Sequence, residues 1–456
     1  MASSKDAMLG TESIPKLMLK LSLPAVAAQF INMLYNIVDR IYIGNIPEIG
    51  NLALTGVGVT FPIIMLISAF SAFAGMGGAP LASIRLGAGD KKGAEKILGN
   101  CFVLLCGIAA VLTVVFLIFK EPLLFAFGAS ENIIGYANDY ITIYLFGTVF
   151  VQMALGLNTF ISAQGNATTA MFSVLIGAII NIVLDPILIF GFNMGVKGAA
   201  LATIISQAVS ALWVLRFLFS EKSSIRIRPE YMKLSRKIVG SVAALGIAPF
   251  IMQATESLVS ITLNSGLQKY GGDLYVGSMT IIQSVMQMII MPVQGITQGV
   301  QPIMSYNYGA QNYGRVRKTF FLLLRVTVSL TVLACIIAML FPAILARLFT
   351  PDAELIAITT KVMPIFFAGI WAFGLQMACQ TTFMSLGQAK TSLFLALLRK
   401  IILLVPLAVI LPMVMGNVMG IFIAEPVADI IASLTTFMLF LSQYKKLLPM
   451  EHETAK

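Results

Sequence analysis

Residues 17–44 read LMLKLSLPAVAAQFINMLYNIVDRIYIG, and this stretch decides the fold class. A helix needs about 20 mostly apolar residues to cross a bilayer, and this run is longer than that. It is also too long for the apolar region of a cleaved signal peptide. Gln29, Asn32, Asn36 and Asp39 interrupt it, so the predicted first membrane span carries polar side chains.

Similar apolar runs recur along the whole chain of 456 residues. Hydrophobic residues make up 58% of the chain and charged residues only 11%, with a mean hydropathy of +0.91. Soluble proteins are roughly 25% charged. The composition therefore predicts an all-α integral membrane protein, with twelve transmembrane helices at 17–44, 52–80, 95–119, 135–157, 166–191, 196–219, 238–265, 274–303, 316–342, 357–381, 392–412 and 417–442.

The placement of the basic residues predicts the orientation. A net charge of +10 could suggest nucleic acid as a partner. With the N-terminus in the cytoplasm, however, 21 Lys and Arg residues fall on the cytoplasmic side, 5 fall outside and 4 fall within spans. This bias follows the positive-inside rule. We therefore expect both termini in the cytoplasm, a basic surface facing anionic lipid, and no nucleic-acid partner.

The chain divides at a polar segment, residues 220–237 (SEKSSIRIRPEYMKLSRK), into two halves that resemble each other. Residues recur 222 positions apart at Pro80 and Pro302, Gly87 and Gly309, Gly165 and Gly387, and Gly198 and Gly420. We predict two six-helix bundles, 1–219 and 238–456, joined by a cytoplasmic linker. Because six spans are an even number, both bundles keep one orientation, and a pseudo-twofold axis should run along the membrane normal.

Amides and one carboxylate line matching helix faces in both halves. Buried polar groups in membrane helices normally face the bundle interior and mark a pathway, although single amides also serve as hydrogen-bonding contacts between helices. We expect a polar substrate cavity between the halves, lined by Gln29, Asn32, Asn36, Asn158, Gln253, Glu256, Gln283, Gln287 and Gln380.

A second group of polar residues is predicted at one depth in the first bundle. Asn181 and Asp185 are four residues apart on one helix face, and Asp39, Thr203 and Tyr140 are expected beside them. Two carboxylates with an amide, a hydroxyl and a phenol suit a proton or a hard cation, with a possible Na+ at Asp39, Asn181 and Asp185. The alternative is that Arg40 pairs with one of the acids as a structural bridge.

The second bundle contains a different set of charges. A tight turn near residue 416 should bring Arg399 and Lys400 close to Asp429, which predicts a structural ion pair between Arg399 and Asp429, with Glu425 as a further acid. Glu256 has no evident cationic partner in the sequence. It is therefore our candidate in the second half for binding a cationic substrate or a proton.

The residue inventory argues against an enzyme. No phosphate-binding loop for ATP, no nucleophile–base pair within the spans and no metal-ligand cluster is present. All four cysteines fall within predicted spans and the single histidine is His452 in the tail. We expect no cofactor other than a possible bound Na+, and an ion gradient as the source of energy.

Two motifs resemble those of a known family. Residues 298–310, QGVQPIMSYNYGA, and residues 35–44, YNIVDRIYIG, followed by GVGVTFP at 56–62, are similar to multidrug and toxic compound extrusion (MATE) transporters of the bacterial MepA-like branch. The resemblance covers nearly the whole chain. It implies two six-helix bundles, alternating access, and a first-bundle cation site at Asp39, Asn181, Asp185 and Thr203, beside Tyr140. Some members carry an aspartate in the tenth span, whereas residues 362–381 here contain no acid.

The resemblance predicts a function. It implies a monomeric antiporter in the bacterial inner membrane that exports amphipathic or cationic organic compounds in exchange for H+ or Na+. A flippase for a lipid-linked saccharide and a Na+-coupled metabolite symporter are the alternatives. A flippase would favour cations in the cavity to bind phosphates, whereas this sequence places acids and amides there.

Overall fold

The first half of the protein consists of helices crossing the molecule in alternating directions. The computed structural model describes residues 4–449; His452 and Lys456 lie outside them. The helices of the first half are α1 (Ser4–Thr11), α2 (Ile14–Gly44), α3 (Gly50–Gly87), α4 (Lys91–Ala126), α5 (Ile134–Phe146), α6 (Thr148–Gly156), α7 (Asn158–Ala163), α8 (Ala167–Pro186), the π-helical turn η1 (Ile187–Gly191) and α9 (Val196–Phe219).

The second half repeats this order after a short 3₁₀ turn, η2 (Pro229–Tyr231). Its helices are α10 (Arg236–Gly271), α11 (Asp273–Gly309), α12 (Tyr313–Leu340), α13 (Pro342–Arg347), α14 (Ala353–Phe366), the 3₁₀ turn η3 (Phe367–Gly369), α15 (Ile370–Ser385), α16 (Ala389–Leu397), the π-helical turn η4 (Leu398–Leu404), α17 (Val405–Met415) and α18 (Met419–Leu447). Residues 4–449 contain no β-strand.

The twelve predicted spans are confirmed, and one of them is bent. Within residues 4–449, eleven helices are long and apolar enough to cross a membrane. The twelfth span is the pair Ile134–Phe146 and Thr148–Ala163, which bends by 60°. The break falls at Gly147, where a Cβ atom would lie 2.0 Å from Cδ1 of Ile204. Glycine therefore lets the bent span approach α9 closely.

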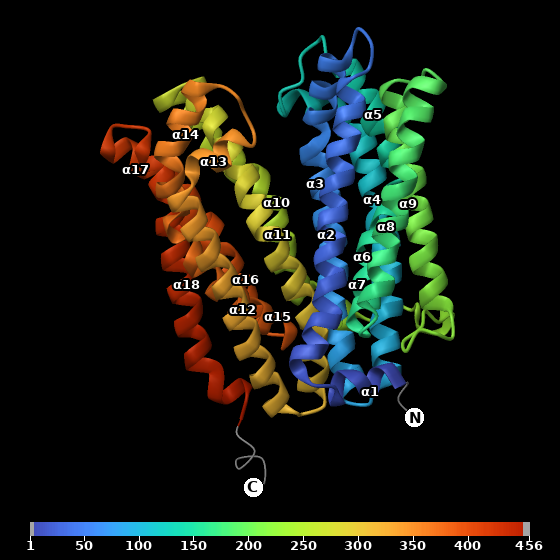
Figure 1. The fold of residues 1–456 in the computed structure, drawn as a ribbon. Coiled ribbons are helices and arrows are strands. Elements are labelled where there is room, and N and C mark those ends of the chain that lie inside the picture. The colour runs from blue at the N-terminus through green and yellow to red at the C-terminus, as the bar shows by residue number, and fades with distance from the viewer. Residues whose placement is uncertain (1–3, 450–456) are drawn as a thin grey trace.

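The two halves lie side by side and meet at one end (Figure 1). The first long helix of each half packs on the second long helix of the other, since α2 contacts α11 and α10 contacts α3. α1 lies at the end where the halves meet, and the ribbons diverge towards the opposite end (Figure 1). We call these the closed end and the open end.

Glycines allow this crossed packing, and they do so symmetrically. A Cβ atom at Gly87 would lie 1.9 Å from the carbonyl oxygen of Tyr306, and one at Gly309 would lie 1.9 Å from that of Ile84. Tyr306 and Ile84 are themselves 222 positions apart, as are the two glycines. The closed end is thus formed by two equivalent backbone contacts related by the internal repeat, as small residues at close helix crossings permit.

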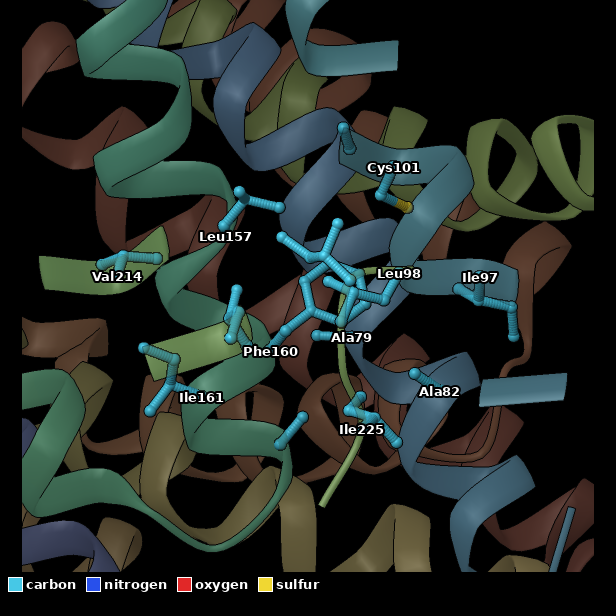
Figure 2. Packing of buried hydrophobic residues seen from close by; sticks show 14 of the residues in the cluster. Ala79, Ala82, Ile97, Leu98, Cys101, Leu157, Phe160, Ile161, Val214 and Ile225 are labelled. Atoms are coloured by element: carbon cyan, nitrogen blue, oxygen red, sulfur yellow. The ribbon is translucent and has the colours of Figure 1, made fainter. Parts of the chain in front are cut away.

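The segment between the halves folds back onto the first half. Gln164 Oε1 accepts hydrogen bonds from the Ser223 hydroxyl at 2.9 Å and from the backbone N–H of Ser224 at 2.7 Å. Ile225 is buried in the first-half core beside Phe160 and Leu98 (Figure 2). Arg228 Nε donates to Glu95 Oε2 at 2.9 Å. The linker is therefore an ordered, packed element.

Candidate functional site

A polar cavity of about 250 Å³ lies in the first half and extends to the second. Its wall is built by α2, α3, α6, α7, α8 and α9, together with Gln253 of α10 and Gln298, Gln301, Pro302 and Ser305 of α11. Amides and serines account for 15 of the 29 residues that line it, and small apolar residues supply most of the others. Within residues 4–449, the side chains that line this cavity include no Lys, Arg, Asp or Glu.

Four of the predicted cavity residues line this space. Gln29 and Asn32 come from α2, Asn158 from the start of α7 and Gln253 from α10. Gln29 Nε2 donates to Gln298 Oε1 across the two halves at 3.2 Å. The Oδ1 atom of Asn158 and the Oε1 atom of Gln253 are buried and accept no hydrogen bond within the described structure. They are acceptors available to a donor from a ligand or water.

The other five predicted cavity residues lie elsewhere. Asn36 is exposed and donates to the Asn32 carbonyl at 2.7 Å. Gln283 is half-buried and Gln287 exposed, both on α11 towards the open end. Gln380 is buried on α15, with Nε2 3.2 Å from Met252 Sδ. Glu256 is exposed on α10. The expectation that all nine surround one space is wrong: Gln380 and Glu256 contact groups of the second half, and Asn36, Gln283 and Gln287 do not reach the lining.

The predicted cation cluster comes together between α2, α5, α8 and α9. The carboxyl groups of Asp39 and Asp185 lie next to each other in this cluster. Asn181 Nδ2 is 3.4 Å from Asp185 Oδ1 and 3.5 Å from Thr203 Oγ1. Tyr140 is buried on α5, close to Thr203.

Three oxygens of this cluster have no donor. Asp39 Oδ1, Asn181 Oδ1 and Asp185 Oδ2 are buried and accept no hydrogen bond within residues 4–449. An unsatisfied buried acceptor costs free energy, so the arrangement favours a cation or a donor between them. Oxygens are also the ligands that hard cations prefer. The donor set therefore fits a proton or a Na+ ion.

Arg40, the alternative partner of these acids, lies over the ring of Phe61, with Cζ 5.5 Å from the ring centroid. No group of three or more His, Cys, Asp or Glu side chains within residues 4–449 could hold a metal ion. A bound cation would therefore depend on the Asn181 amide and the Thr203 hydroxyl as well as on the two carboxylates.

A separate charged cluster occupies the second half. Arg399 Nε donates to Asp429 Oδ1 at 2.6 Å and Arg399 Nη2 to Glu425 Oε1 at 3.0 Å. The neighbouring Lys400 forms an ion pair with Glu256 and donates to the Met252 carbonyl at 2.9 Å. The expectation that Glu256 has no cationic partner is therefore wrong. The two residues are 144 positions apart, and only the tertiary packing of α10 against α16 and η4 brings them together.

Sequence reasoning also missed most of the cavity wall. Small hydroxyl residues on several helices line it: Ser68, Ser71, Ser83, Thr159, Ser162, Ser173, Ser206 and Ser210. Single serines occur throughout membrane helices and their hydroxyls can bond to their own backbone, so they stand out less than amides or acids do. Tyr35 could have been predicted as a cavity residue from the sequence, because it lies on the same helix face as Asp39 and Asn32.

Comparisons with known proteins agree with this architecture. A sequence model of the MatE family matches residues 24–187 and, a second time, residues 249–410. The multidrug export protein MepA of Staphylococcus haemolyticus (strain JCSC1435) is 24% identical over 430 residues, which span 94% of this chain and 94% of the relative.

Solved structures share the fold. A MATE protein in complex with MaL6 superposes with a TM-score of 0.90 at 24% identity, covering 98% of this chain and 99% of the other. An outward-facing multidrug resistance MATE family transporter of the MOP superfamily gives a TM-score of 0.89 at 24% identity, with the same coverage. Because each half matches the family model over most of its length, this multi-span membrane protein belongs to the MatE family of multidrug and toxic compound extrusion transporters, which are not enzymes.

Proposed function

We propose that this protein exports amphipathic organic cations by antiport with H+ or Na+, using alternating access. One observation carries the proposal. A cluster of two carboxylates and one amide, with three oxygens that accept no hydrogen bond among the described residues, lies next to the cavity. Both are reached from α2, where Tyr35 lines the cavity and Asp39 belongs to the cluster. Ion occupancy and cavity shape are thus coupled through one helix.

The mechanism follows from this coupling. An ion entering from the open end binds Asp39, Asp185 and Asn181 and satisfies their unpaired oxygens. Since α2 packs against both α8 and α11, a change at this cluster can alter the contact between the two halves. One charge that moves down 100 mV contributes about 2.3 kcal/mol, which suffices for modest accumulation of substrate per ion.

The substrate class rests on the cavity and on the relatives. An uncharged wall of amides and hydroxyls can bind varied ligands without fixing one charge pattern. The Staphylococcus relative bears the name multidrug export protein. The cavity lies within a single chain, so we propose a monomer. We place it in the bacterial cytoplasmic membrane with both termini inside.

The two alternative functions, a flippase and a metabolite symporter, have less support than export does. A flippase for a lipid-linked saccharide needs cations for the phosphates, and the described lining of the cavity supplies none. A Na+-coupled metabolite symporter would use the same Asp39 cluster, and it differs in the direction in which substrate moves when an ion gradient is imposed.

Transport by everted vesicles or proteoliposomes tests the proposal. Ethidium movement is measured under an imposed pH gradient and, separately, under an imposed Na+ gradient. We expect Asp39→Asn to lower gradient-driven efflux by at least about tenfold. Asp139→Asn is the matched control, because Asp139 pairs with Lys197 at an exposed position.

The outcomes separate the hypotheses. Undiminished gradient-driven efflux by Asp39→Asn would remove the first-half coupling site. Absence of ethidium transport by the wild type under both gradients would overturn the export function and favour the flippase or the symporter.

A further inference from the structure

The ion pair between Lys400 and Glu256 joins a buried cation to an exposed carboxylate. The Lys400 side chain is 8% exposed, whereas that of Glu256 is 61% exposed. Lys400 is held on its buried side by the Met252 carbonyl at 2.9 Å. One partner of this pair is therefore hidden in the second half, and the other remains open to an incoming ligand.

Glu256 lies outside the lining of the cavity, on the same helix as one of its wall residues. Gln253 lines the polar cavity, and Glu256 follows it by three residues on α10, which places both on one helix face. α10 runs from the closed end towards the open end (Figure 1), so Glu256 is about one turn nearer the open end than Gln253 is. A ligand that leaves the cavity towards the open end passes this carboxylate.

The other acids near Lys400 are not available to it as ion-pair partners. Its neighbour Arg399 engages both Asp429 and Glu425, so these acids are already occupied. If an organic cation took Glu256, the Lys400 ammonium would keep, among the described residues, the hydrogen bond to the Met252 carbonyl, with a second positive charge nearby. A dehydrated cation without its counter-ion is costly. The pair therefore re-forms readily when a bound cation departs.

We propose that Lys400 is an internal competitor for Glu256 that favours release of cationic substrates at the open end. Its ammonium group occupies the carboxylate in this conformation and lowers the affinity of the open state for an organic cation, as an exporter requires. The inference rests on the proposed export function. It assigns Lys400 a role in substrate release and charge selectivity, beyond tying α16 to α10.

Binding of two dyes of nearly equal shape tests the role. Cationic rhodamine 6G and zwitterionic rhodamine B are titrated into the purified protein in lipid nanodiscs, and the fluorescence anisotropy gives each Kd. We expect Lys400→Met to tighten rhodamine 6G binding by at least about tenfold, because Glu256 becomes free for the ligand, and to leave rhodamine B within about threefold. The variant should also release rhodamine 6G more slowly.

Matched variants separate this role from a structural one. Lys400→Met should fold, since the carboxylate that it leaves unpaired is largely exposed. The double variant Glu256→Gln with Lys400→Met removes both charges and should bind the two dyes with similar affinity. Lys269→Met, at the open end of α10, is the control substitution and should match the wild type.

Three results would contradict either the role of Lys400 in substrate release or the proposed function. Folded Lys400→Met protein with wild-type affinity for rhodamine 6G would overturn the inference and leave a structural tie, whose loss changes only the melting temperature. Equal tightening of both dyes would also overturn it. A wild type that binds neither dye and transports no organic cation would instead contradict the proposed function.

Discussion

At the scale of single residues, the acids within the membrane fall into two kinds. Asp39 and Asp185 are close to each other and leave oxygens without donors. Glu425 and Asp429 are saturated by Arg399, which also stacks over Phe373 with its Cζ 4.8 Å from the ring centroid. Among the described residues, only the second pair has a buried cation beside it, so these acids anchor helices, whereas the first pair keeps oxygens available for the ion that we propose.

Arg315 performs an anchoring role at the closed end. Its Nη2 atom donates to the carbonyl of Glu12 at 2.7 Å and to that of Leu9 at 3.2 Å, and its Nε atom to Asn307 Oδ1 at 3.1 Å. These bonds cap the last carbonyls of α1 and attach it to the second half. Leu9, which is fully buried, packs next to Gly165 of the first half. α1 therefore bridges both halves.

Replacing Arg315 should release α1. Charge-assisted hydrogen bonds contribute about 1.5–3 kcal/mol, so Arg315→Gln should raise hydrogen exchange of the backbone amides at residues 8–12 by roughly tenfold to a hundredfold. Exchange mass spectrometry on the whole protein measures this. Arg317→Gln is the control on the same helix and should leave the exchange unchanged. Equal protection in both variants would show that α1 is held by apolar packing alone.

At the scale of the elements, the fifth span of each half contains a π-helical turn. In the first half η1 begins two residues after Asp185, and in the second half η4 contains Arg399 and Lys400. Such turns interrupt regular helical spacing and often occur at functional sites. Adjacent residues on a helix point in different directions, so Arg399 and Lys400 reach α18 and α10 respectively, although they are neighbours in the chain.

Helix contact at the closed end depends on Gly87 and Gly309. A Cβ atom at Gly309 would lie 1.9 Å from a backbone oxygen, which cannot yield as a flexible side chain would. Gly309→Ala should therefore separate α11 from α3, lower stability by about 1–3 kcal/mol and make the closed end more accessible to thiol labelling. Thermal unfolding and labelling rates of cysteines introduced there measure both effects.

The control for this prediction is Gly240→Ala on α10. A Cβ atom there meets nothing within 4 Å. Alanine is the better helix former, so this variant should be unchanged or slightly more stable. Similar losses of stability in both variants would mean that the loss of glycine, and not the crossing of α11 and α3, is responsible.

At the scale of the whole molecule, two equivalent crossings hold the halves together at one end. α1 and the last turn of α18 both lie at that end (Figure 1). An even number of spans places both termini on one side of the membrane. If the basic loops are cytoplasmic, the open end faces the outside.

Orientation can be checked with reporters fused to the C-terminus. We expect a green fluorescent protein fusion to fluoresce and an alkaline phosphatase fusion to be inactive, because the first folds in the cytoplasm and the second requires disulfides that form outside it. Fusions after residue 130, in the loop between α4 and α5, should give the opposite pattern. A reversed result would make this conformation inward-open.

Much of this protein follows from local sequence. The twelve spans were predictable because hydrocarbon demands long apolar helices with internally bonded backbones. The offset of 222 positions located the glycine pairs that cross at the closed end. Asp39, Asn181, Asp185 and Thr203 were predictable as a group, since the spacing on α8 and the tight turn into α9 determine their relative depth.

Tertiary packing decided the Lys400–Glu256 ion pair and the composition of the cavity wall. The ion pair of Lys400 with Glu256 depends on how α10 and α16 come together, and no local pattern encodes a contact between residues 144 positions apart. The cavity wall is assembled from single serines on several helices, each uninformative alone. Residues 17–44 therefore determine that the chain enters the membrane with polar side chains on one face. Which of those side chains meet an ion, a substrate or the other half is decided by helix crossing, because burial and charge pairing arise only between helices.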